Sequence, residues 1–190
     1  MKREALPDFT AVSEEPLEIF LQPGDLYFGS GHTRIRTLLG SCVAISVWHP
    51  QLRIGGLCHY MLPSRGPHHS AHHDLDGKYG DEAMLLFLRE MRGAGTLPQE
   101  YEAKLFGGGH MFTAHTAASA DVSRKNVQRG RELVRRHGLT LRAEHLGGEG
   151  HRNLWFELWS GDVYLKFWGQ NAEQRRPGMA CVACVSESSA

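Results

Sequence analysis

A cysteine and a histidine in the first third of the chain are the residues best suited to covalent chemistry. Cys42 follows Gly40 and Ser41 at the junction of two apolar segments, where a tight turn can expose a side chain and leave backbone N–H groups unpaired. A free thiol has a pKa of about 8.5 and gives little thiolate at neutral pH, so a nucleophilic cysteine needs a base. His59 lies 17 residues further on, in the next apolar segment. Thr37, Ser41 or a backbone carbonyl can accept from the other ring nitrogen of His59, and such a set is typical of nucleophilic catalysis.

The same residues also have a purely structural interpretation. A cysteine among Val and Ile residues is usually a small buried hydrophobic residue, and a strand histidine is often a satisfied core residue. Cys58 adjoins His59, and in an extended segment their side chains point to opposite faces, so at most one of them faces Cys42. Spacing alone leaves both interpretations open.

A polar segment further along the chain carries the residue types of a metal site. These residues are His68, His69, His72, His73, Asp74 and Asp76. The segment has no apolar period and no HExxH glutamate, so we expect a long exposed loop without a physiological metal. A metalloenzyme built on this loop is an alternative, and it predicts that a chelator removes activity.

Two further motifs carry little chemistry by themselves. Cys181 and Cys184 form a lone CxxC, and one such pair cannot close a structural zinc site. Glycines at 107–109 and 147–148 each end an apolar segment, where they can wall a substrate cleft or form a tight turn. Neither run matches a phosphate-binding pattern, so we expect no nucleotide cofactor.

Length and composition predict one globular domain. The 190 residues are 41% hydrophobic and 22% charged, which suffices for a core. Lys and Arg number 21, as do Asp and Glu, so no basic excess favours nucleic acid as a partner. No run of eighteen apolar residues occurs, and acidic residues interrupt the N-terminal region where a secretory signal would be apolar. We therefore expect a cytoplasmic protein with reduced thiols and no membrane insertion.

The apolar pattern predicts mainly strands with two inserted helices, hence an α+β fold with mostly antiparallel strands. Met84, Phe87, Leu88 and Met91 recur at helical spacing, and Gly93 with Gly95 supplies the stop. A weaker basic helix is expected at 123–137, after a loop at 114–120, with Asp121 or Ser123 as its cap. Strands are expected at 25–29, 35–39, 43–48, 54–62, 101–106, 139–146, 153–159 and 163–168.

The same pattern divides the chain into three parts. Residues 1–22 have scattered Pro and acidic residues, so we expect an N-terminal arm. The folded domain is expected at 23–169. Small and polar residues dominate 170–190, which we expect to be a flexible C-terminal tail.

Several separated motifs resemble the CheD family of chemoreceptor glutamine deamidases. The motifs are TLLGSCVAISVWHP (37–50), GGLCHYMLP (55–63), YGDEAM (79–84), EAKLFGGGHMF (102–112) and AEHLGGEGHR (143–152). The resemblance implies a single-domain α/β/β layered sandwich. It places the family's catalytic cysteine at Cys42, its histidine at His59 and its supporting threonine at Thr37. Ser123 and Lys125 stand where the family usually has Gly and Arg, while the family's asparagine is kept as Asn126.

The resemblance also implies an activity and partners. Family members convert glutamines of methyl-accepting chemotaxis proteins to glutamate without a metal or organic cofactor, and some hydrolyse receptor methyl esters. Some bind CheC, a phosphatase of the chemotaxis response regulator. The alternative from a different class is a non-catalytic module that docks receptors or a CheC-type phosphatase, with Cys42 as a structural residue.

Overall fold

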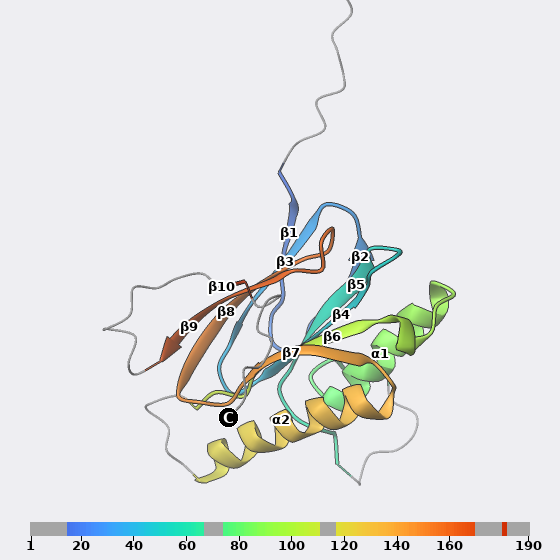
Figure 1. Cartoon of the computed structure of the whole chain (residues 1–190). Helices are drawn as coiled ribbons and strands as arrows, with labels where there is room; N and C mark the ends of the chain where they lie inside the picture. Colours follow the sequence, from blue (N-terminus) through green and yellow to red (C-terminus); the bar gives the residue numbers. More distant parts are fainter. Residues whose placement is uncertain (1–14, 67–73, 111–116, 170–179, 182–190) are drawn as a thin grey trace, which may run out of the picture.

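The computed structural model describes residues 15–66, 74–110, 117–169 and 180–181 (Figure 1). The helices in these residues are α1 (Gly80–Gly93), α2 (Ala117–Arg136) and the short 3-10 helix η1 (Pro98–Glu100). The strands are β1 (Leu17–Phe20), β2 (Leu26–Ser30), β3 (Thr33–Leu39), β4 (Val43–His49), β5 (Ile54–Tyr60), β6 (Glu102–Gly107), β7 (Thr140–Leu146), β8 (Gly150–Glu157), β9 (Val163–Gly169) and β10 (Ala180–Cys181).

The strands form two sheets, and the helices cover one of them. The first sheet has the order β1-β3-β8-β9-β10 and the second has the order β2-β5-β4-β6-β7. Among the described strands, β1 pairs with β3 and β6 with β7 in parallel, and the other pairs are antiparallel. Helix α1 contacts β2 and β5, while α2 contacts β4, β6 and β7, on the second sheet (Figure 1). The predicted α+β class and α/β/β layered sandwich are confirmed.

Two apolar cores separate the three layers. Side chains of β4 and β5 alternate between the cores because successive residues of a strand point to opposite faces. The helix-side core contains Val43, Ile45, Val47, Cys58, Tyr60, Ala83, Met84, Phe87, Met91, Tyr101, Ala103, Leu105, Leu133, Val134 and Leu139. The intersheet core contains Leu21, Ile35, Leu39, Ala44, Leu57, Phe106, Leu154, Phe156, Leu158, Val163 and Leu165.

The turn at 40–42 carries the chain from one sheet to the other. Strand β3 ends at Leu39 and pairs with β8 in the first sheet, whereas β4 begins at Val43 in the second sheet. The sequence correctly predicts two strands with a break at Gly40. Because the break is a crossing between sheets, Cys42 stands at the edge of the intersheet space.

Helix α1 agrees with the predicted apolar stripe. Met84, Phe87 and Met91 are buried and Leu88 packs against the same core. The chain leaves the helix at Gly95, whose φ of 72° suits glycine better than any side chain. In the described residues, neither α1 nor α2 combines the length and apolar character that a membrane span requires.

Helix α2 begins earlier than predicted. The sequence predicted a loop up to residue 120 and a cap at Asp121 or Ser123, but the helix already begins at Ala117, so both predictions are wrong. Alanine has the highest helix propensity, which favours helix before Asp121. The Asp121 carboxylate then forms ion pairs with Arg124 and Lys125, one turn further on, as an interior helix position allows.

Each predicted terminal segment contributes a short edge strand. β1 lies within the predicted arm at 1–22 and pairs in parallel with β3. β10 lies within the predicted tail at 170–190 and pairs with β9. Strands of this length carry no clear apolar alternation, so their pairing depends on the backbone of the neighbouring strand rather than on a sequence pattern. The rest of the predicted tail lies outside the described residues.

Candidate active site

Thr37 and His59 meet between the two sheets. Each side chain is 2% exposed. Thr37 Oγ1 lies 2.8 Å from His59 Nδ1 and donates a hydrogen bond to the Leu21 carbonyl at 2.9 Å. The hydroxyl has one proton and the carbonyl can only accept, so the hydroxyl oxygen accepts from His59 Nδ1. This assigns the ring proton to Nδ1 and leaves the lone pair on Nε2.

The second nitrogen of the His59 ring is unused. Nε2 is buried and has no hydrogen-bond partner within the described part of the chain. Burial lowers the pKa of His59 to about 4, although the charge of Asp25 and a hydrogen bond with the Leu21 carbonyl act in the opposite direction. The imidazole is therefore neutral at pH 7, and Nε2 can accept a proton.

Cys42 lies on the same side of the second sheet as His59. The register pairs Ala44 with His59, and Cys42 stands two residues before Ala44. Side chains two residues apart share a face, so Cys42 and His59 are diagonal neighbours on adjacent strands. Cys42 packs against the intersheet core. Burial raises the pKa of its thiol, while a hydrogen bond with Ser41 acts against that rise, so a thiolate there requires a base.

Cys58 faces the other way. Its side chain is completely buried in the helix-side core. Burial raises the pKa of this thiol to about 12. The structure therefore brings His59, and not Cys58, to the face of Cys42, in agreement with the expected alternation along an extended segment.

The glycine run after β6 packs against the turn that carries Cys42. Gly108 N donates to the Cys42 carbonyl at 2.8 Å, and Gly109 N donates to the Gly40 carbonyl at 2.7 Å. A Cβ atom built on Gly107, whose φ is 113°, would lie 2.2 Å from the Cys42 carbonyl oxygen. Only glycine permits this close backbone approach, so the run both ends β6 and supports the cysteine turn.

Asn126 of α2 links the cysteine turn to the histidine strand. It is fully buried, and its Nδ2 donates to the carbonyls of Ser41 at 3.3 Å and Met61 at 2.8 Å. The Tyr60 hydroxyl donates to the Asn126 carbonyl at 2.6 Å. The sequence identified Asn126 only as the family's asparagine and did not predict these contacts. A single polar residue in a basic helix shows no sign of burial until the helix is packed.

Arg152 of β8 is a second buried polar residue that the sequence patterns did not single out. It is 1% exposed and donates from Nε to His145 Nδ1 at 2.8 Å and from Nη2 to the Gly147 carbonyl. Burial lowers the pKa of its guanidinium to about 10, so the group is still charged at neutral pH. A Cβ atom on Gly109 would lie 2.9 Å from Nη1, so this cation lies behind the glycine run.

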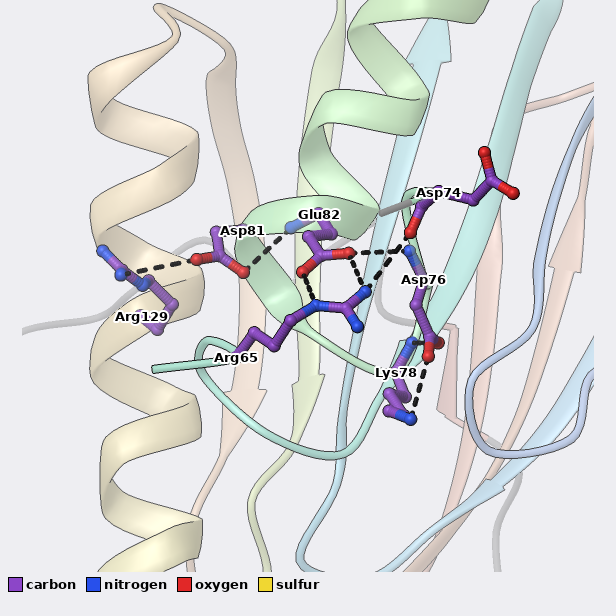
Figure 2. Close-up of polar contacts among 7 residues, drawn as sticks. All are labelled: Arg65, Asp74, Asp76, Lys78, Asp81, Glu82 and Arg129. Carbon is purple, nitrogen blue, oxygen red and sulfur yellow. Dashed lines mark hydrogen bonds and ion pairs between the residues drawn. The ribbon is translucent and has the colours of Figure 1, made fainter. Parts of the chain in front are cut away.

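A charged network holds the two sides of the segment 67–73 against α1 (Figure 2). Glu82 accepts from Arg65 Nε at 2.6 Å and from Arg65 Nη2 at 2.7 Å. It also accepts from the backbone N–H of Asp76 at 2.8 Å. Arg65 in turn donates to the Asp74 carbonyl at 3.3 Å. Residues on both sides of the segment are thus bound to the first turn of α1.

The other His and Asp candidates either lie outside the described residues or belong to the charged network. His68, His69, His72 and His73 and the second cysteine of the CxxC, Cys184, lie outside the described residues. Asp74 and Asp76 lie in the charged network rather than near Cys42. Within the described ranges, no three His, Cys, Asp or Glu side chains gather as a metal ion would require.

Comparisons with known proteins agree with the motif resemblance. Residues 61–167 match the family model described as "CheD chemotactic sensory transduction". The chain is 51% identical over 168 residues to "Probable chemoreceptor glutamine deamidase CheD 3" of Dechloromonas aromatica, an alignment that covers 87% of this chain and 97% of the relative. The chain belongs to the CheD family. A CheD relative from Pseudomonas savastanoi is 50% identical over 78% of this chain and 84% of its own length. One from Leptospira interrogans is 40% identical over 79% and 92%.

The match to the CheD family model covers only part of the candidate site. Its matched residues include Asn126 and Arg152 and begin two residues after His59. Cys42 and Thr37 precede the match. Their assignment as catalytic residues depends on the motif resemblance and on the contacts described above.

Proposed function

We propose that this CheD protein is a protein-glutamine deamidase that converts glutamines of chemoreceptors to glutamate, with Cys42 as nucleophile, His59 as base and Thr37 as the residue that orients His59. The relatives that cover most of the chain carry the name chemoreceptor glutamine deamidase. The proposal places this activity in the cytoplasm, where thiols stay reduced.

One observation carries the choice of residues. The buried His59 ring is fixed through Nδ1 by Thr37, and its Nε2, which has no partner among the described residues, lies on the face that Cys42 shares. An unpaired buried nitrogen costs free energy, so its retention favours a role in which it binds a proton during the reaction. A merely structural histidine would have both nitrogens satisfied.

The first half of the reaction forms a thioester. The neutral imidazole of His59 takes the Cys42 thiol proton as the sulfur attacks the carboxamide carbon of a receptor glutamine. The carbonyl oxygen becomes an oxyanion, and backbone N–H groups near Ser41 and Cys42 are the proposed donors that stabilise it. The imidazolium then gives its proton to the nitrogen, the C–N bond breaks, and ammonia leaves.

The second half restores the enzyme. His59 removes a proton from a water molecule, whose oxygen attacks the thioester carbon. The C–S bond breaks, the sulfur regains its proton, and the receptor side chain leaves as glutamate. Each cycle consumes one water and releases one ammonia, so the reaction requires neither an oxidant nor an organic cofactor.

Replacement of Cys42 tests this function. Cys42→Ala is expected to abolish the mass change from amide to acid in a purified chemoreceptor, while the protein still folds because the volume lost is small. Cys58→Ala is the matched control and is expected to retain activity. Deamidation by Cys42→Ala at the wild-type rate would overturn the mechanism and favour the non-catalytic binding module.

Binding to a CheC-type phosphatase is the second partner in the proposal, and only the motif resemblance supports it. Titration of the purified chain with a CheC protein, followed by calorimetry, is expected to give saturable binding. Heat signals no larger than those of buffer dilution would remove this partner.

A further inference from the structure

The Asn126 side chain donates two hydrogen bonds to backbone carbonyls of the candidate active site. Its Nδ2 binds the carbonyl of Ser41, the residue before Cys42, and the carbonyl of Met61, two residues after His59. It is fully buried. Its Oδ1 has no hydrogen-bond partner among the described residues, so burial of this amide is not explained by complete satisfaction of its polar atoms.

The contact with Ser41 fixes the direction of the next N–H. The Ser41–Cys42 peptide is trans, so its C=O and N–H point in opposite directions within one plane. Asn126 holds the carbonyl on the side of α2, and the Cys42 N–H therefore points away from α2. No described backbone carbonyl accepts from this N–H. The backbone of Cys42 also acts to lower the pKa of its own thiol, against the rise that burial causes.

We infer that Asn126 is a positioning residue that aims the Cys42 N–H at the oxyanion formed during deamidation. The inference rests on the proposed function, because it assigns a role within that reaction. An N–H adjacent to the nucleophile, with no backbone acceptor in the described residues and held in one orientation, is the arrangement that stabilises charge developing on a carbonyl oxygen. Without the amide of Asn126 the peptide can rotate, and the N–H is no longer aimed.

Two reactions of Cys42 separate this role from simple structural support. Deamidation passes through an oxyanion and needs the aimed N–H. Alkylation by iodoacetamide needs the thiolate and the base His59, but it forms no oxyanion. A residue that only keeps Cys42 near His59 affects both reactions equally, whereas a residue that aims the N–H affects deamidation alone.

The experiment compares Asn126→Ala with Tyr60→Phe in the full chain. Tyr60→Phe is the matched control, because it removes a buried hydrogen bond to Asn126 itself without touching the Ser41 carbonyl. For Asn126→Ala we expect kcat for receptor deamidation to fall about 100-fold, with KM nearly unchanged, as for loss of one oxyanion donor. We expect iodoacetamide labelling of Cys42 to stay within a few-fold of wild type. Tyr60→Phe is expected to keep both rates.

Equal losses in both reactions, or no loss of deamidation, would overturn the inference. If Asn126→Ala does not fold, Asn126→Asp replaces it, because this variant keeps the shape and has at most one donor. A small aldehyde, propanal, gives a readout that needs no receptor, since its adduct with Cys42 carries an oxygen in the oxyanion position. Propanal inhibition of labelling is expected to weaken at least about tenfold in the Asn126 variant. If the wild-type protein deamidates no receptor, the proposed function fails. If propanal affinity is unchanged in the Asn126 variant, the positioning role of Asn126 fails.

Discussion

Two polar regions of this protein are built on opposite principles. Around Cys42 the side chains of Thr37, His59 and Asn126 are neutral and buried, and two of their polar atoms have no described partner, namely His59 Nε2 and Asn126 Oδ1. Around Glu82 the groups are charged, and both carboxylate oxygens are hydrogen-bonded (Figure 2).

The Glu82 network anchors chain segments, whereas the region around Cys42 has groups that can react. A carboxylate with both oxygens bonded to Arg65 and Asp76 has little capacity left for a ligand, and its contacts hold two chain segments together. The His59 imidazole, by contrast, has Nδ1 held by Thr37 and Nε2 without a partner in the described residues. Its Nε2 is therefore available to bind a proton at a fixed position. Substitutions at the buried region should therefore reduce activity, and substitutions in the charged network should reduce stability alone.

The largest expected effect is the loss of His59, the proposed base. His59→Ala should lower the rate of receptor deamidation by at least about 1,000-fold, because a nucleophile and its base act as a unit. Mass spectrometry of the receptor after incubation measures it. His151→Ala, which removes a histidine stacked on Trp168 at the first sheet, is the control and should retain the wild-type rate. Substantial activity in the His59 variant would mean that another residue acts as the base.

Loss of the orienting hydroxyl should cost less. Thr37→Val keeps the buried volume but removes the group that accepts from His59 Nδ1, so we expect deamidation to slow by about 10- to 100-fold. Thr37→Ser restores a hydroxyl and should recover most of the rate. Failure of serine to recover activity would mean that packing at this position, rather than the hydrogen bond, matters.

The buried imidazole also predicts how stability depends on pH. The pKa of His59 is lowered by burial to about 4 from an ordinary value of 6.5. Between these values the unfolded chain binds a proton that the folded chain does not, so the free energy of unfolding falls as the pH falls through this window. The contribution of this group is at most about 3 kcal/mol.

Urea denaturation at pH 7 and pH 4.5 measures this effect. The wild type should lose more stability between the two values than His59→Gln, which has no group to protonate at that position. Burial also lowers the pKa values of His137 and His145, so the difference between the two proteins, and not the slope of either, reports His59. Equal slopes would contradict a buried neutral imidazole.

The smallest expected effect lies in the charged network. Glu82→Gln breaks a part-buried ion pair and should lower Tm by roughly 2–4 °C, with deamidation unchanged. The hydrogen bond from Arg65 holds the pKa of Glu82 below its ordinary value, so the wild type should lose this contribution as the pH falls through that pKa. A large loss of activity in Glu82→Gln would mean that the charged network also supports deamidation, contrary to the separation argued above.

Much of the fold was predictable from local patterns. Apolar alternation located most strands within a few residues, and the spacing from Met84 to Met91 located α1. Short strands such as β1 were not predictable, since four residues give too little alternation. The start of α2 was missed because the alanines before Asp121 look like a polar linker when no packing partner is known.

The candidate site divides in the same way. The sequence by itself determined which residues have suitable chemistry, because the Gly40–Cys42 turn, the following histidine and the family motifs are all local features. The alternation of a strand even determined that Cys58 and His59 face opposite sides.

Only the tertiary structure decided which of these groups meet. Thr37 and His59 lie on different sheets, and their contact depends on how the sheets pack face to face. Asn126 reaches the cysteine turn because α2 lies on the second sheet, and Arg152 becomes a buried cation because β8 lies in the first. Such contacts join residues far apart in the chain, and they form when apolar faces of whole elements are buried, so no local pattern records them.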